Sequence, residues 1–264
     1  MCVVNAIESK VVMRVPKGRI PFEFEREDLA KVVRLVMERR DTNVVGGNIS
    51  IRVTDDTGKD YLVMTPTMMS EAYLGEVSPA QILVVEPHTR KIIDGVGKLT
   101  REINLHEAVY DTNPEIKAVL HAHAPNSMFW ATAGLDMPNL TEATQKIGYV
   151  PVLDFEPNCS PELAGLVSDY MEKEKLELPN MLLLNSHGVL ISAPGETGIE
   201  AIHKALQILD TTEWNAEIAY KQTIFQSLGL LDGYYSKGKQ VGTIEDLKDH
   251  NPIYNREEIF AGGD

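Results

Sequence analysis

The sequence of 264 residues is poor in positive charge. It contains 25 lysines and arginines against 39 aspartates and glutamates, which gives a formal net charge of −14. A chain this acidic lacks the basic surface that binds phosphate backbones or anionic membranes, so we expect neither nucleic acid nor a membrane as a partner. Small molecules and protein subunits are the partners that remain.

Cysteine is also scarce. The two cysteines, Cys2 and Cys159, lie far apart, and neither belongs to a CxxC pair. This predicts neither a disulfide framework nor a thiolate metal site, and it favours a reducing, cytoplasmic compartment. No apolar run reaches the length of a signal-peptide core near the N-terminus or the roughly 18 residues of a membrane span elsewhere. We therefore expect a soluble protein that is not exported.

Two common catalytic motifs are missing. The chain contains no GxGxxG loop, which argues against an NAD-dependent oxidoreductase, and no GxSxG elbow surrounds Ser186, which argues against a serine hydrolase. The chain is long enough to bury a sizeable core without a metal. Any metal is therefore expected to serve function rather than folding.

Hydrophobic periodicity predicts a mixture of helices and strands. Helical spacing covers 27–40, 100–113, 161–174 and 195–228. Strands are predicted at 48–53, 61–65, 82–86, 91–93, 116–123, 181–184 and 189–192. In the strand at 116–123, Ile116, Ala118 and Leu120 are expected to share one face. Hairpin pairs with few βαβ crossovers predict an α/β protein of the α+β type, in which helices flank a central, mostly antiparallel sheet.

No linker or repeat divides the chain. We expect one domain over 25–228, with an N-terminal arm over 1–24 and a C-terminal tail over 229–264.

Three histidines form a candidate metal site. His121 and His123 occupy positions i and i+2 of a predicted strand, so their imidazoles project from the same face and can converge on one cation. His187 follows an apolar strand, directly before Gly188, and is placed to act as a third ligand. Taken singly, each of these residues can equally be a surface, core or turn-capping histidine.

Glu102 opens the helix predicted from Thr100 and is expected in its first turn. An isolated glutamate there ordinarily favours the helix dipole, whereas beside three histidines it would be a general acid/base. His106, four residues later, is interpreted as a packing residue rather than a ligand. The segment Gly46-Gly47-Asn48 can form either an anion-binding nest or a simple turn.

Taken together, these segments resemble the class II aldolase and adducin family. The resemblance rests on GGNISIR at 46–52, MTPT at 64–67, GKLTREINLHEAVYDTNPEIKAVLHAHAP at 97–125 and LLLNSHGVL at 182–190. It covers roughly residues 25–225 and implies that family's three-layer domain and a homotetramer with sites near subunit contacts. It also implies one divalent metal per subunit, most often Zn²⁺ with Mn²⁺ or Fe²⁺ as alternatives, held by His121, His123 and His187.

The resemblance further makes Glu102 the catalytic acid/base. It implies a substrate-phosphate site formed by three pairs: Gly47 and Asn48, Thr67 and Met68, and Thr100 and Arg101. The sequence departs from the family where Met68 replaces a glycine and where Thr100-Arg101 replaces two serines. Arginine can pair bidentately with phosphate or carboxylate, whereas methionine crowds the approach of a phosphate to the backbone. A small anionic substrate is therefore expected, and whether it is phosphorylated stays open.

Some aldolases of the family use a tyrosine of the adjacent subunit as a proton donor. Glu142 occupies that region here, and we interpret it as a helix-start carboxylate rather than a catalytic group. Tyr234-Tyr235 near the C-terminus is another source of a hydroxyl for a neighbour's site.

The expected reaction is retro-aldol cleavage of a ketose phosphate, or of a related hydroxy-ketone or acid, through a metal-stabilised enediolate. Met68 and Arg101 keep open the decarboxylation of a hydroxy acid. Epimerisation is less favoured, because epimerases of the family usually carry aspartate where this chain has Glu102. A non-catalytic, adducin-like assembly module would have no use for converging histidines.

Overall fold

The computed structural model describes residues 21–69, 72–145, 147–148 and 150–229. Its helices are α1 (Glu23–Glu38), the short 3-10 helix η1 (Pro79–Gln81), α2 (Ile103–Thr112), α3 (Pro125–Ala133), α4 (Glu142–Gln145), α5 (Pro161–Glu174) and α6 (Gly198–Ser227). Its strands are β1 (Asn48–Thr54), β2 (Asp60–Met64), β3 (Leu83–Glu86), β4 (Lys91–Asp94), β5 (Ile116–Ala122), β6 (Val152–Leu153), β7 (Asn180–Leu184) and β8 (Gly188–Pro194).

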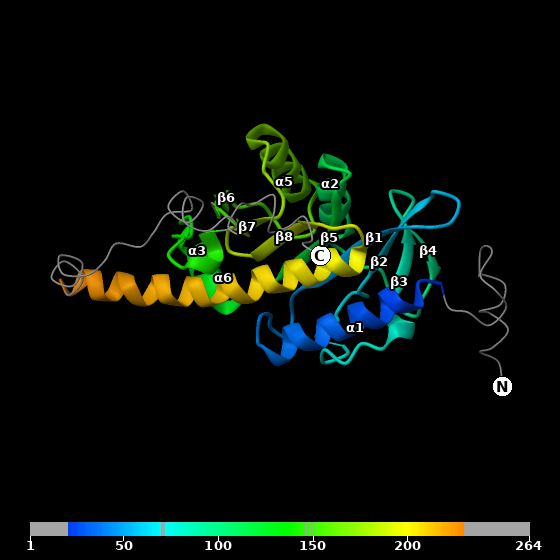
Figure 1. The fold of residues 1–264 in the computed structure, drawn as a ribbon, viewed down its shortest axis with the longest axis horizontal. Coiled ribbons are helices and arrows are strands. Elements are labelled where there is room, and N and C mark those ends of the chain that lie inside the picture. Colours follow the sequence, from blue (N-terminus) through cyan, green and yellow to red (C-terminus); the bar gives the residue numbers. More distant parts are fainter. Residues whose placement is uncertain (1–20, 70–71, 146, 149, 230–264) are drawn as a thin grey trace.

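All eight strands form a single sheet in the order β4-β3-β2-β1-β5-β8-β7-β6. Every neighbouring pair is antiparallel except β6 and β7. Helices α1, α3 and α6 cover one face of the sheet, and α2 and α5 cover the other (Figure 1). The predicted fold class, a mostly antiparallel sheet flanked by helices, is therefore confirmed, and its layers number three.

Strand β5 lies at the centre of the sheet and contributes to both cores. Ala118 and Leu120 pack in the cluster under α1 and α6, whereas Val119 packs in the cluster formed with α2 and α5. Ile116 also belongs to this second cluster, so its predicted place beside Ala118 and Leu120 is wrong. The reason is an irregularity in the pairing of β5 with β8 between Ile116 and Ala118, which shifts the alternation of side chains.

Several helix ends differ from the periodicity prediction. Helix α1 begins at Glu23, four residues before the predicted start, and α2 begins at Ile103, after Glu102 rather than before it. Helix α3 was not predicted, because nine residues starting at a proline and apolar on several sides show no clear period. The predicted arm and tail fall almost entirely outside the described residues. No helix in the described ranges is both long and apolar enough to cross a membrane.

Asp41 follows α1 and carries a buried carboxyl beside α6. Its Oδ2 has no hydrogen-bond partner in the structure. Burial, together with the negative charges of Asp210 and Glu213 on α6, raises the pKa of Asp41 from 3.8 to about 6. The proton is held more tightly in the folded chain than in the unfolded one.

This raised pKa predicts a pH-dependent effect of Asp41→Asn. Between about pH 4 and pH 6 the folded chain keeps a proton that the unfolded chain has lost, so stability falls as pH rises through this window and stays lowered above it. We expect Asp41→Asn to raise the free energy of unfolding by about 1 kcal/mol at pH 8, a discounted share of a two-unit shift because Arg39 and solvent screen the charge. Urea unfolding of both proteins at pH 8 and pH 4 measures this difference.

The gain should shrink to a small fraction at pH 4, where the folded chain carries the proton and the unfolded chain has lost it only about half of the time. Asp56→Asn, in the exposed turn between β1 and β2, is the control and should have no effect at either pH. An equal gain for Asp41→Asn at both pH values would contradict the interpretation.

Candidate active site

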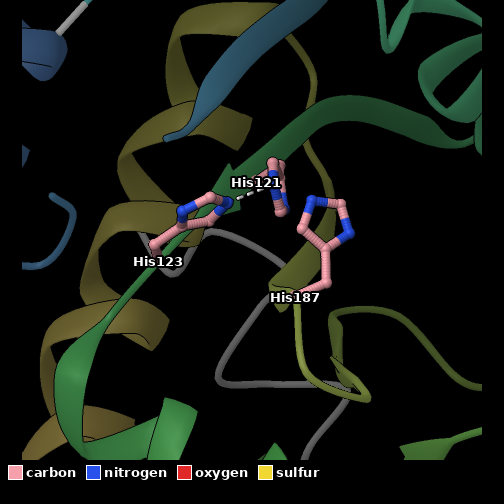
Figure 2. Close-up of side chains that lie close together, drawn as sticks. All are labelled: His121, His123 and His187. Atoms are coloured by element: carbon pink, nitrogen blue, oxygen red, sulfur yellow. Dashed lines mark hydrogen bonds between the residues drawn. The ribbon is translucent and has the colours of Figure 1, made fainter. Parts of the chain in front are cut away.

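The three predicted histidine ligands meet where β5 ends beside the β7–β8 turn. His121 lies in β5 and His123 directly follows the strand. His187 lies in the turn between β7 and β8, and it reaches the same place because β8 pairs with β5, with Val189 opposite Ala122. Figure 2 shows the three imidazole rings turned toward one another. Strand pairing thus joins residues that are more than sixty positions apart in the chain.

The distances suit a single divalent cation. Nε2 of His121 lies 3.2 Å from Nε2 of His123, and the three rings place one nitrogen each within 4.8 Å of one another. Two ligands of a tetrahedral zinc, at Zn–N distances of about 2.05 Å, are about 3.3 Å apart. His121 Nδ1 donates a hydrogen bond to the carbonyl of Val189 at 2.9 Å, so Nε2 carries the free lone pair. His121 is therefore held in the tautomer that binds metal.

Burial of the His121 and His123 imidazoles favours their neutral form, which can bind a metal. Burial lowers the pKa of His121, and burial together with His121 and His187 lowers the pKa of His123 to about 3. Both rings are neutral at physiological pH, as metal ligands must be.

Two glycines make room for these rings. A Cβ on Gly46 would lie 1.9 Å from Nδ1 of His123, and one on Gly188 would lie 2.8 Å from Cε1 of His121. Thr42 holds the same loop, because its hydroxyl accepts the backbone N–H of His123 and donates to the carbonyl of Gly46. The sequence interpretation of Gly46 as part of a nest or turn overlooked this contact. Its function in the structure is to admit the His123 ring.

Glu102 borders the three-histidine cluster. It is the N-cap residue of α2 and not part of the predicted first turn, and only 7% of it is exposed. Its Oε2 accepts a hydrogen bond from the Asn48 amide at 2.6 Å and lies 3.5 Å from Nε2 of His121. Its Oε1 lies 3.2 Å from Nε2 of His187 but accepts no hydrogen bond. Oε2 is thus held by a hydrogen bond, whereas the lone pairs of Oε1 stay unused beside the three histidines.

The surroundings of Glu102 keep it ionised. Burial by itself raises the pKa of a carboxyl, but the His121 and His187 imidazoles and the Asn48 amide outweigh it and hold the pKa of Glu102 well below its ordinary value. Three converging imidazoles beside a carboxylate with an unsatisfied buried oxygen form a donor set that fits a divalent metal.

An open cleft of about 530 Å³ lies over the cluster. Of the residues singled out from the sequence, it is lined by Gly47, Asn48, Thr67, Met68, Thr100, Arg101, Glu102, His123 and His187. All six predicted substrate-binding residues thus reach one cleft, and their role in binding stays a prediction. Met68 has a φ of 60°, a conformation that favours glycine, and half of it is exposed. A glycine would fit this backbone more readily than the methionine that crowds the cleft.

Several neighbours of the site were not predicted. Asn158 and Cys159 line the cleft from the loop before α5, and Asn104 of α2 donates to the carbonyl of Ser160 at 2.8 Å, which ties this loop to the site. No motif marked these residues. His106, predicted to pack, is fully buried and hydrogen-bonds to Ser50 and Asn48.

The two candidates for a donor from a neighbouring subunit have different outcomes. Glu142 begins α4, is exposed and does not line the cleft, in keeping with its interpretation as a helix-start carboxylate. Tyr234 and Tyr235 lie outside the described residues.

Comparison with known proteins agrees with this geometry. The family described as "Class II Aldolase and Adducin N-terminal domain" matches residues 27–220. The chain is 31% identical over 170 residues to the L-fuculose phosphate aldolase of Methanococcus maripaludis, a match that covers 62% of this chain and 81% of the relative. It is 28% identical over 149 residues to the 3-oxo-tetronate 4-phosphate decarboxylase of Cupriavidus necator, covering 54% of this chain and 64% of the relative.

Among solved structures, an L-fuculose 1-phosphate aldolase superposes with a TM-score of 0.63 at 23% identity, over 76% of this chain and 86% of that one. This likeness shows a shared fold.

The contact between Gly46 and His123 predicts the effect of Gly46→Ala. The added methyl group would overlap the His123 ring, so the ring or the loop must move and one ligand leaves its position. We expect the affinity for Zn²⁺ to fall at least about tenfold. Competition with a chelator of known affinity measures it.

Gly165→Ala is a matched control, because a Cβ at this position of α5 meets nothing within 4 Å. This variant should bind Zn²⁺ like the original chain. Equal affinities for the two variants would show that Gly46 does not position His123.

Proposed function

The chain belongs to the class II aldolase and adducin family, and from this we propose that it is a metal-dependent aldolase acting on a ketose phosphate. It is an enzyme of this superfamily, whose similar members named above are an aldolase and a decarboxylase, both lyases. The observation that carries the proposal is the convergence of His121, His123 and His187 beside the Glu102 carboxylate, under an open cleft.

The proposed ligands of the metal, of which we favour Zn²⁺, are His121, His123 and His187. When bound, a divalent metal supplies Lewis-acid stabilisation of the negative charge that develops as the carbon–carbon bond breaks. With His121, His123 and His187 as its protein ligands, such a metal would keep a position for substrate, as catalytic zinc sites do. His121 contributes a fixed tautomer, and Gly46 and Gly188 keep the rings close together.

Glu102 is the proposed acid/base. In the condensation direction its Oε1 takes a proton from the carbon beside the substrate carbonyl, and in the cleavage direction it returns that proton to the same carbon. The hydrogen bond from Asn48 keeps Oε2 out of this exchange and leaves Oε1 free. The carboxylate is ionised at neutral pH and can therefore accept a proton.

The proposed substrate is small and phosphorylated. Both relatives named above act, by their names, on phosphorylated compounds. Arg101 is an exposed cation at the cleft, and Thr67 and Thr100 add hydroxyl groups there. These groups would provide a local positive site for an anion in an acidic protein.

A decarboxylase is the second candidate. It is favoured by the similarity to the 3-oxo-tetronate 4-phosphate decarboxylase and by the replacements at Met68 and Arg101. Loss of CO₂ leaves an electron pair on the carbon beside a carbonyl, just as retro-aldol cleavage does, so the same residues would serve.

We also propose that the chain assembles, as a homotetramer, by analogy with the family. The second half of α6 exposes large apolar side chains, among them Trp214 and Phe225, which are 65% and 50% exposed. Side chains of this size are typical of subunit contacts.

Two variants test the proposed roles of the site residues. Glu102→Gln should keep the metal, since the three imidazoles are unchanged, and should lower kcat at least about 100-fold because the amide cannot take a proton. His121→Ala should lose both the metal and the activity. Metal content and turnover are measured together for each protein, and full activity of Glu102→Gln would exclude it as the acid/base.

Product analysis separates the candidate reactions. The zinc-loaded protein is incubated with L-fuculose 1-phosphate, other ketose phosphates and 3-oxo-tetronate 4-phosphate, and released aldehyde and CO₂ are measured. We expect aldehyde release from a ketose phosphate. CO₂ release without aldehyde would favour the decarboxylase, and no product with no bound metal would favour an assembly module.

A further inference from the structure

A hydrogen-bonded network of buried polar side chains lies behind the Glu102 carboxylate. Tyr110 Oη lies 2.9 Å from Ser50 Oγ, which lies 2.7 Å from Nδ1 of His106. Nε2 of His106 contacts Oδ1 of Asn48, and Nδ2 of Asn48 donates to Glu102. Each of these side chains belongs to a residue at most 7% exposed. Behind Asn48 and Glu102, which line the cleft, no solvent can replace a hydrogen bond lost at Ser50, His106 or Tyr110.

Strand β1 and helix α2 supply the residues of this network, at spacings that place them on one face of each element. Asn48 and Ser50 are alternate residues of β1 and share one face of the sheet. Glu102, His106 and Tyr110 follow one another at intervals of four, from the N-cap along one side of α2. The helix side and the strand face meet, and each polar group finds a partner across the contact.

In each of these hydrogen bonds, the donor and the acceptor can be assigned in only one way. Nδ2 of Asn48 donates to Oε2 of Glu102, so the amide turns its NH₂ toward Glu102 and its oxygen toward His106. His106 Nε2 must then donate, and because burial keeps His106 neutral, with a pKa of about 3, its Nδ1 accepts from the Ser50 hydroxyl. The Tyr110 hydroxyl donates to the Ser50 backbone carbonyl at 3.0 Å.

We propose that His106 is a positioning residue, which fixes the orientation of the Asn48 amide and thereby holds Glu102 with Oε2 anchored and Oε1 free. The proposal rests on the proposed role of Glu102. If the Asn48 amide flipped, its oxygen would face the carboxylate and its NH₂ would face the N–H of His106. Both contacts would then be repulsive, and no water reaches the fully buried His106 to relieve its contact.

This proposal also changes the expected role of Asn48. The resemblance implies that Asn48 binds the substrate phosphate, whereas in the structure its amide oxygen is bound by His106 and its nitrogen donates to Glu102. The side chain serves the acid/base through its oxygen and one N–H, and the second N–H of Nδ2 is left for an anion in the cleft.

Two isosteric replacements of His106 test the proposal. The amide nitrogen of His106→Gln can occupy the place of Nε2 and donate to Asn48, whereas that of His106→Asn overlies Nδ1 and reaches only Ser50. We expect His106→Asn to lower kcat about 10- to 100-fold with KM and zinc content unchanged. Losses of this size are found when a residue that orients an active-site group by a hydrogen bond is replaced. His106→Gln should stay within about threefold of the original chain.

His203→Asn, on an exposed histidine of α6 that pairs with Asp28, is the control for the substitution itself and should leave kcat unchanged. Equal kcat values for His106→Asn and His106→Gln would overturn the proposal. So would a parallel loss of kcat and zinc content in both variants, which is the result expected of a merely structural residue.

If His106→Asn fails to fold, Ser50→Ala takes its place. Without the Ser50 hydroxyl, the proton of the His106 ring can move from Nε2 to Nδ1. Nε2 then no longer donates to the oxygen of Asn48. We expect kcat to fall at least about threefold with KM unchanged, and an unchanged kcat would overturn the proposal. An original chain that turns over no substrate in the panel would instead contradict the proposed function.

Discussion

The burial of the Glu102 carboxylate is the constraint on which the site depends. Removing such a charge from water costs several kcal/mol unless it is paired and hydrogen-bonded. The hydrogen bond from the Asn48 amide offsets part of this cost, and the proposed metal beside His121 and His187 would offset more. Asn48 can do so in one orientation, which the buried His106 imposes. The stabilisation of the Glu102 charge in the cleft therefore depends on how α2 packs on β1.

Local charge reconciles an acidic protein with the proposed anionic substrate. The net charge of −14 is a property of the whole chain, while the cleft presents Arg101 and a cluster of nitrogen donors. Over the few ångströms of a binding site, adjacent groups dominate the potential, because more distant surface charges are screened by salt within about 8–10 Å. Overall charge thus argues against nucleic acid as a partner without arguing against a small phosphorylated compound.

The elements that were predicted well are those whose signal is local. Helix α5 was predicted with its observed bounds, because Pro161 follows the capping residue Ser160 and the apolar residues keep helical spacing. The hairpin of β1 and β2 was equally clear, because alternation and a turn lie within one short segment. Ile116 was placed on the wrong face, since an irregularity in strand pairing depends on the partner strand rather than on the neighbouring residues.

By itself the sequence determined the fold class, because periodicity is a property of neighbouring positions. Its resemblance to the family singled out His121, His123 and His187 as candidate ligands and Glu102 as the candidate acid/base. Only the tertiary structure decided that Gly46 admits the His123 ring, that Asn158 and Cys159 reach the cleft, and that His106 contacts Asn48. These are contacts between segments far apart in the chain. Their existence depends on how the sheet orders its strands and on which helix face meets them, which no local pattern records.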